Sequence, residues 1–170
     1  MLNSTENCLL LGQQLGEILL RKKWMISTAE SCTGGGLARA ITAVPGASQW
    51  FGYGWVTYAN QAKQKLLNVS AKTLEEYGAV SEEVVLEMAT GAMKISGANV
   101  AVAISGIAGP TGGTVEKPVG SIWYAFVSVQ QKITKLQLFQ GDREEIQSRA
   151  VKAALEGILD LLNEEEKNTV

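Results

Sequence analysis

The chain has 170 residues, a formal net charge of −2, 46% hydrophobic residues and two cysteines in unrelated contexts, so we expect one cytoplasmic domain spanning residues 1–170. The weak negative charge argues against nucleic-acid binding, and no apolar run reaches the roughly 18 residues that a membrane-spanning helix needs. The absence of histidine excludes imidazole catalysis and histidine metal sites, so a general base must be Lys, Glu, Asp or Tyr.

The first part of the chain predicts a helix, a strand, a tight turn and a second helix. Apolar residues recur at helical spacing over residues 5–22, and residues 24–30 favour a strand. After the turn, an apolar stripe from Leu37 to Val44 predicts a helix that Pro45 brings to an end. The turn between the strand and the second helix is therefore a junction of the kind that often carries function.

The middle of the chain alternates between strands and helices in the same way. Aromatic and β-branched residues predict a strand over residues 50–58, and Asn60 is suited to cap a helix over residues 61–67. Ser81, followed by two glutamates, predicts the start of a longer helix. Residues 99–105 are almost continuously apolar, as in a central strand covered by helices on both faces.

The last part predicts a hairpin and a terminal helix. Two strands over residues 119–129 and 133–140 are joined by a short polar turn, and Asp142 and Glu145 have the spacing of a capping box. Strands alternating with helices, together with one hairpin, predict a three-layer α/β/α sandwich with a mixed, mostly parallel sheet. In such folds ligands bind at the carboxyl ends of the strands.

The turn after the first strand, S-T-A-E-S-C-T-G-G-G at residues 27–36, suggests several kinds of site. Ser31 or Thr33 would lie near a helix N-terminus, where free amides favour an anion, but a hydroxyl cap with closely packed glycines accounts for the same residues. A phosphate-binding P-loop is disfavoured because no Gly-Lys-Ser/Thr follows. Cys32 as a nucleophile would need a partner that stabilises its thiolate, and no histidine is available.

Ser31 as a nucleophile requires a base, and Lys63 is the candidate. Lys63 lies in the first turn of a predicted helix, where the helix dipole and burial would both lower its pKa. Alternatively, Lys63 is one more solvated lysine beside Lys65 and Lys72. With the Tyr58 hydroxyl between them, Ser31 and Lys63 would form a chemically complete acyl-transfer set.

The segment 105–120 is rich in glycine and includes hydroxyl residues and Lys117. Such loops can surround a phosphate with backbone amides, although they also serve as flexible connections. Arg143 and Arg149 in the last helix could reach the same phosphate or pair with nearby acids. No cluster of carboxylates has metal-ligand spacing, so we expect no metal and no cofactor.

Five segments together resemble the CinA C-terminal domain family, which includes stand-alone nicotinamide mononucleotide deamidases. The resemblance covers roughly residues 8 to 160, and its segments are T-A-E-S-C-T-G-G (28–35), V-T-Y-A-N-Q-A-K (56–63), G-A-V-S-E-E-V (78–84), the loop 105–120 and F-Q-G-D-R (139–143). Several motifs in the same order are far more specific than any one glycine loop.

The resemblance implies hydrolysis of the carboxamide of nicotinamide mononucleotide, a small-molecule substrate, to nicotinate mononucleotide and ammonia without metal. It implies Ser31 as the nucleophile, Lys63 as the base and Tyr58 as their partner. It also implies a homo-oligomer, with a dimer favoured. The substrate-binding positions that we expect are Glu30, Cys32, Thr33, Gly34, Gly35, Ser105, Gly106, Gly109, Gly112, Gly113, Lys117, Arg143 and Arg149.

Two other functions are compatible with the same residues. A non-catalytic nucleotide-binding module of the CinA type would bind ligand without turnover, and a hydrolase of another carboxamide or of a phosphate ester would release a different product. The Ser31, Tyr58 and Lys63 set favours catalysis over binding alone.

Overall fold

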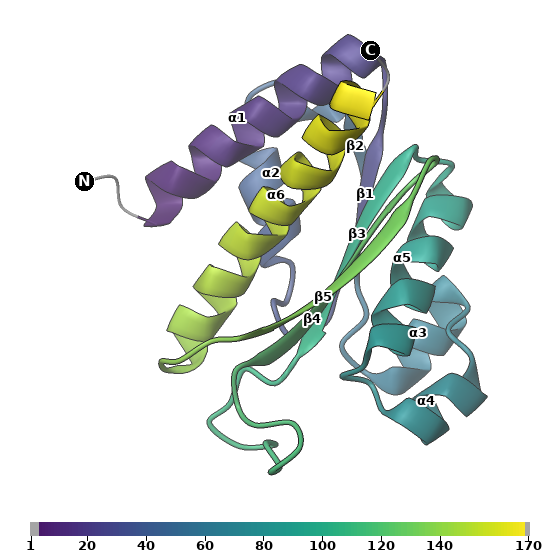
Figure 1. Cartoon of the computed structure of the whole chain (residues 1–170), viewed down its shortest axis with the longest axis vertical. Coiled ribbons are helices and arrows are strands. Elements are labelled where there is room, and N and C mark those ends of the chain that lie inside the picture. The colour runs from purple at the N-terminus through teal and green to yellow at the C-terminus, as the bar shows by residue number, and fades with distance from the viewer. Residues whose placement is uncertain (1–3, 169–170) are drawn as a thin grey trace.

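The computed structural model describes residues 4–168 as a five-stranded sheet between two layers of helices (Figure 1). Residues 1–3 and 169–170, which the expected domain 1–170 includes, lie outside the described residues. The elements are α1 (Ser4–Lys22), β1 (Ile26–Glu30), α2 (Gly36–Thr42), a 3-10 turn (Ala47–Gln49), β2 (Phe51–Val56), α3 (Asn60–Leu67), α4 (Ala71–Tyr77), α5 (Glu82–Ser96), β3 (Val100–Gly106), β4 (Ser121–Ser128), β5 (Lys132–Leu138) and α6 (Arg143–Asn168).

The sheet has the strand order β2-β1-β3-β4-β5. Strand β1 pairs in parallel with β2 and β3, whereas β4 is antiparallel to both β3 and β5. Four of the five strands therefore run in one direction and only β4 opposes them, which confirms the mixed, mostly parallel sheet. The carboxyl ends of β1, β2 and β3 meet at one edge of the sheet.

The helices cover both faces of the sheet, which confirms the three-layer sandwich (Figure 1). Helices α1, α2 and α6 pack on one face and α3, α4 and α5 on the other. Six of the seven residues of β3 are buried, as expected for a central strand covered on both faces. The core is accordingly divided into two apolar clusters, one for each face.

Capping residues fix where several helices begin. The Ser81 hydroxyl accepts a hydrogen bond from the Val84 amide at 3.3 Å, which confirms the start of α5. Asp142 and Glu145 each accept from the other's amide at 2.9 Å, so the predicted capping box is present. The expectation for Asn60 is wrong, because Asn60 is already helical and Ala59 occupies the cap position without a side-chain bond.

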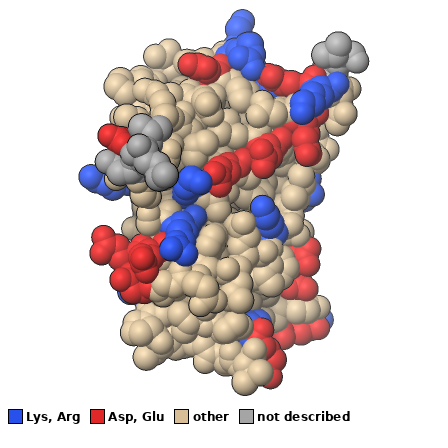
Figure 2. Space-filling model, turned by 60° about the vertical axis from the view of Figure 1, so that its left-hand side comes forward, with Lys and Arg blue, Asp and Glu red and all other residues tan. Residues whose placement is uncertain are grey.

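The charged side chains show no segregation on the face that Figure 2 presents, where Lys and Arg are interspersed with Asp and Glu. Over residues 4–168, no helix combines the length and apolar character that crossing a bilayer requires. Within the same residues, no three Cys, Asp or Glu side chains lie close enough together to hold a metal ion.

Candidate active site

A pocket of about 350 Å³ opens at the carboxyl ends of β1 and β3 and at the junction of β2 with α3. It is the place at which the strand order predicts a ligand. Its walls are formed by Ser31, Cys32, Tyr58, Lys63, Ala79, Val80, Ser105, Gly106, Ile107, Ala108, Gly109, Thr111, Gly112 and Arg143. No carboxylate is among these residues.

Ser31 and Lys63 are in direct contact at the bottom of this pocket. Ser31 directly follows β1 and Lys63 lies in the first half of α3, and the ammonium Nζ donates to Ser31 Oγ at 3.0 Å. Lys63 Nζ also donates to the carbonyl oxygen of Thr57 at 2.7 Å. Lys63 is 1% exposed and Ser31 is 8% exposed, so the pair is almost fully removed from water.

Burial changes the acidity of Lys63. Desolvation penalises the charged ammonium and lowers the pKa of Lys63 from 10.5 to about 8. Within residues 4–168, no carboxylate lines the pocket to compensate for this effect. With a pKa of about 8, roughly a tenth of Lys63 is neutral at pH 7, far more than for an ordinary lysine, and this fraction can accept a proton from Ser31.

Cys32 follows Ser31 in the chain, but burial makes its thiol a poor nucleophile. It is 5% exposed, and desolvation raises the pKa of its thiol to about 12. The thiolate, the reactive form, is therefore negligible at neutral pH. This argues against the alternative in which Cys32 is the nucleophile.

Glu30 organises the turn that carries Ser31. Its side chain is fully buried, and its carboxylate accepts hydrogen bonds from the Thr33 hydroxyl at 2.7 Å and from the amides of Leu37 and Ala38 at 2.8 and 3.0 Å. The anion that the helix N-terminus favours is thus supplied by the protein itself. Helix α2 begins at Gly36, three residues after Thr33, so the predicted proximity of Ser31 and Thr33 to the first helical turn is only approximate.

We predict that Glu30→Ala destabilises the fold, because it removes the acceptor of the buried Leu37 amide and of the partly buried Ala38 amide. The expected loss is about 2–4 kcal/mol of unfolding free energy, or roughly 5–12 °C in thermal midpoint. Thermal unfolding followed by circular dichroism measures it. Glu75→Ala, which removes an exposed glutamate of α4, is the matched control, and an equal midpoint for the two variants would contradict this role of Glu30.

Tyr58 and Arg143 form the rim of the pocket. Tyr58 is 60% exposed, and its hydroxyl accepts from Arg143 Nη2 at 2.8 Å instead of lying between Ser31 and Lys63. Arg143 Nη1 donates to the carbonyl oxygen of Gly109, whose φ of 74° is in the region that favours glycine. The rim therefore ties α6, the β2–α3 junction and the glycine loop together.

Several of the expected substrate-binding residues lie outside the pocket. Lys117 Nζ donates to the carbonyl oxygen of Tyr77, and Arg149 donates to that of Gln140. The Thr33 hydroxyl donates a hydrogen bond to the Glu30 carboxylate, and neither residue lines the pocket. Gly34, Gly35 and Gly113 complete the set of expected residues that do not line the pocket.

Residues between α4 and α5 also form part of the wall and had not been assigned to the site from sequence. Ala79 and Val80 line the pocket, and Ser105 Oγ donates to the carbonyl oxygen of Ala79 at 2.7 Å. Ile107 and Ala108 are further wall residues. The signal for Ala79 and Val80 was their place in the segment G-A-V-S-E-E-V, although they have no chemical group of their own.

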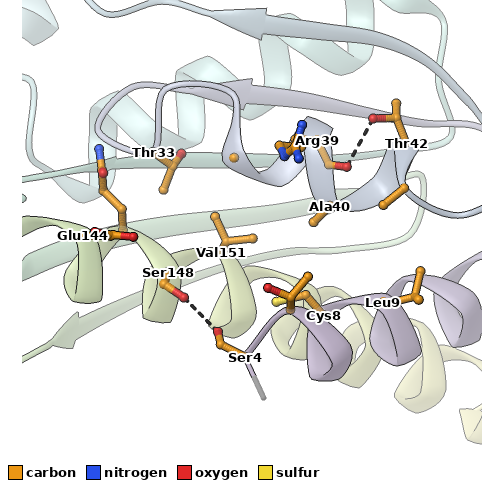
Figure 3. Close-up of a pocket in the computed structure, with 14 residues that line it drawn as sticks. Ser4, Cys8, Leu9, Thr33, Arg39, Ala40, Thr42, Glu144, Ser148 and Val151 are labelled. Atoms are coloured by element: carbon orange, nitrogen blue, oxygen red, sulfur yellow. Dashed lines mark hydrogen bonds between the residues drawn. The ribbon is translucent and has the colours of Figure 1, made fainter. Parts of the chain in front are cut away.

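A second, larger hollow of about 750 Å³ lies between α1, α2 and α6 (Figure 3). Thr33 from the turn, Glu144 and Ser148 from α6, and Cys8 from α1 line this groove. It lacks the Ser31–Lys63 contact, so we assign the chemistry to the smaller pocket.

Comparison with known proteins agrees with the geometry. The family model described as the CinA C-terminal domain matches residues 10–162. The chain is 51% identical over 150 residues to the nicotinamide-nucleotide amidohydrolase PncC of Enterobacter agglomerans, covering 88% of this chain and 92% of that protein. It is 48% identical to the protein of the same name from Escherichia coli K12, covering 86% and 89% of the two chains.

A solved structure of a competence-damaged protein (CinA) superfamily member from Escherichia coli superposes with a TM-score of 0.89 at 42% identity, covering 95% of this chain and 94% of that one. The sequence resemblance, the family model and the shared fold therefore agree. The chain belongs to the CinA C-terminal domain family.

Proposed function

We propose that the protein is an amidohydrolase that converts nicotinamide mononucleotide and water to nicotinate mononucleotide and ammonia. The relatives named nicotinamide-nucleotide amidohydrolase support the reaction. The observation that carries the mechanism is the 3.0 Å contact between Lys63 Nζ and Ser31 Oγ, two buried side chains that line the pocket. In a chain without histidine, neutral lysine is one of the few side chains that can act as the base, and Lys63 is in contact with Ser31.

In the proposed mechanism, neutral Lys63 takes the proton of Ser31 as its oxygen attacks the carboxamide carbon. The amides of Cys32 and Thr33 donate to no oxygen among the described residues, so they are available to stabilise the tetrahedral oxyanion. A donor of this kind contributes about 3–4 kcal/mol. Lys63 then returns the proton to the leaving ammonia, and water hydrolyses the acyl-Ser31 ester by the reverse sequence.

The contacts favour direct proton transfer from Ser31 to Lys63 over a relay through Tyr58. The Tyr58 hydroxyl is bonded to Arg143, whereas Lys63 touches Ser31 itself. In this proposal Tyr58 forms the rim of the pocket and holds Arg143 in place for the substrate.

The test is an assay of ammonia release from nicotinamide mononucleotide. Release of one ammonia for each nicotinate mononucleotide supports the proposal. Thermal stabilisation by the nucleotide without turnover would favour the non-catalytic binding module instead, and phosphate release would favour a phosphate-ester hydrolase.

Arg143 is the proposed anchor of the substrate's 5′-phosphate, because it is the arginine that lines the pocket. We predict that Arg143→Met raises KM for nicotinamide mononucleotide about 10- to 100-fold, the value of one or two charge-assisted hydrogen bonds. The KM for nicotinamide riboside, which has no phosphate, should change far less. Arg149→Met is the matched control. If Arg143→Met raised the KM of both substrates equally, the assignment of Arg143 to the phosphate would be wrong.

We also propose that the protein acts in the cytoplasm as a homo-oligomer, with a dimer as the simplest form. The edge strand β2 supports an interface, because edge strands are normally protected by charged residues and residues 40–62 contain none. On this strand Tyr53 is 54% exposed and stacks on Trp55. Light scattering would measure the molecular mass in solution.

A further inference from the structure

The turn that carries Ser31 is a thin wall between the two hollows. Ser31 and Cys32 line the catalytic pocket, whereas Thr33 lines the groove on the other side (Figure 3). Helix α6 contributes to both sides, because Arg143 lines the pocket and Gln147, one turn later, lines the groove. A side chain of α6 that lines the groove can therefore contact the turn that carries Ser31 from the side opposite the pocket.

Of the three carbonyl groups at the start of this turn, two are held from within the turn and one is held by another element. The carbonyl oxygens of Ser31 and Thr33 accept from the amides of Gly34 and Gly36 within the turn, at 3.1 and 3.0 Å. The carbonyl oxygen of Cys32 accepts from Gln147 Nε2 at 2.8 Å. The orientation of the peptide between Cys32 and Thr33 thus depends on a residue of another element, 115 positions away in the sequence.

This bond sets the direction of the Thr33 amide. The peptide is trans, since the one cis bond in residues 4–168 is Gly109–Pro110, and the C=O and N–H of a trans peptide point in opposite directions. The Cys32 carbonyl accepts from Gln147, which lines the groove, so the Thr33 N–H points away from Gln147.

We infer that Gln147 is a positioning residue of the active site, which holds the Cys32–Thr33 peptide so that the Thr33 amide donates to the oxyanion formed at Ser31. The inference rests on the proposed function, because an oxyanion forms only if Ser31 is acylated. Gln147 touches neither substrate nor reacting atoms and acts through the peptide that it orients. The oxyanion exists only from the transition state onward, so loss of this donor is expected to lower kcat more than it raises KM.

The test replaces Gln147 by methionine, which has a similar length and cannot donate a hydrogen bond. We expect Gln147→Met to lower kcat for ammonia release about 10- to 100-fold while KM stays within about threefold, because a misplaced donor weakens transition-state binding alone. Labelling of Ser31 by a fluorophosphonate, followed by mass spectrometry, should slow by a similar factor. Glu144→Gln, which alters the same groove without touching the turn, is the control and should match the wild type.

Each other outcome has a definite meaning. Wild-type kcat and wild-type labelling in Gln147→Met overturn the inference, and so does a raised KM with unchanged kcat. If the wild type is labelled but releases no ammonia, the proposed reaction fails, and the labelling rates of the two proteins still decide the role of Gln147. If the wild type is not labelled at Ser31, Ser31 is not an activated nucleophile, and the inference about Gln147 is wrong as well. Should Gln147→Met fail to fold, Gln147→Leu, which also lacks a donor and adds no charge, provides the same comparison.

Discussion

Replacing Ser31 by alanine should abolish ammonia release from nicotinamide mononucleotide, with kcat lowered by about 10⁴-fold or more. The reason is that the remaining groups, Lys63 and the turn amides, can no longer form the acyl intermediate. Binding should survive, because the removed hydroxyl is small and the pocket walls remain. Nucleotide affinity measured by calorimetry should therefore stay near that of the wild type.

Two further measurements separate the serine from its neighbour. Acid-quenched turnover of the wild type should leave the substrate's acyl group on the peptide that contains Ser31, as seen by mass spectrometry. Cys32→Ala should lose far less activity than Ser31→Ala, because burial keeps the Cys32 thiol protonated. Full activity in Ser31→Ala would remove Ser31 as the nucleophile, and full activity in Ser31→Ala together with loss of activity in Cys32→Ala would assign that role to Cys32.

The elements that sequence predicts best are those defined by local chemistry. The Asp142–Glu145 capping box and the Ser81 cap depend on residues three apart, and the structure has both. The buried strand β3 follows from an apolar run with no polar face. By contrast, α4 (Ala71–Tyr77) was not predicted, because Leu74 is its one buried residue and no stripe appears in the sequence.

The site was predictable to the extent that it follows from topology. Ser31 and Lys63 are 32 residues apart, and they meet because the parallel strands β1 and β2 end at the same edge of the sheet. Which side chains turn toward the pocket could not be predicted in this way. Glu30 appears beside Ser31 in the sequence, yet a strand places successive side chains on opposite faces, and its carboxylate binds the start of α2.

The difference between Arg143 and Arg149 illustrates the same limit. Both lie in α6 and both could pair with a phosphate, but they are six residues apart and so point in different directions from the helix. Arg143 reaches the pocket and Arg149 reaches Gln140. Choosing between them needs the position of the glycine loop, which depends on contacts distant in sequence.

Replacing Lys63 by methionine or arginine should lower kcat by about 10³-fold, because neither side chain can accept the Ser31 proton at neutral pH. For the wild type, kcat/KM should rise about tenfold per pH unit below 8 and level off above it, since activity follows the neutral fraction of a lysine whose pKa is about 8. Lys65→Met, on the exposed side of α3, is the matched control and should keep the wild-type profile. A wild-type profile that is flat from pH 6 to 9 would remove Lys63 as the base.

The lowered pKa of Lys63 has a second consequence, on stability. The unfolded chain holds the Lys63 proton up to its ordinary pKa of 10.5, whereas the folded site releases it near 8, so between these values the unfolded state binds more protons and stability rises with pH. The free energy of unfolding of the wild type should therefore increase relative to Lys63→Met by about 2 kcal/mol between pH 8 and 10. Urea unfolding of both proteins across this range measures the difference. A difference that does not change with pH would mean that Lys63 titrates in the fold as it does in the unfolded chain, and its assignment as a base at neutral pH would lose its physical ground.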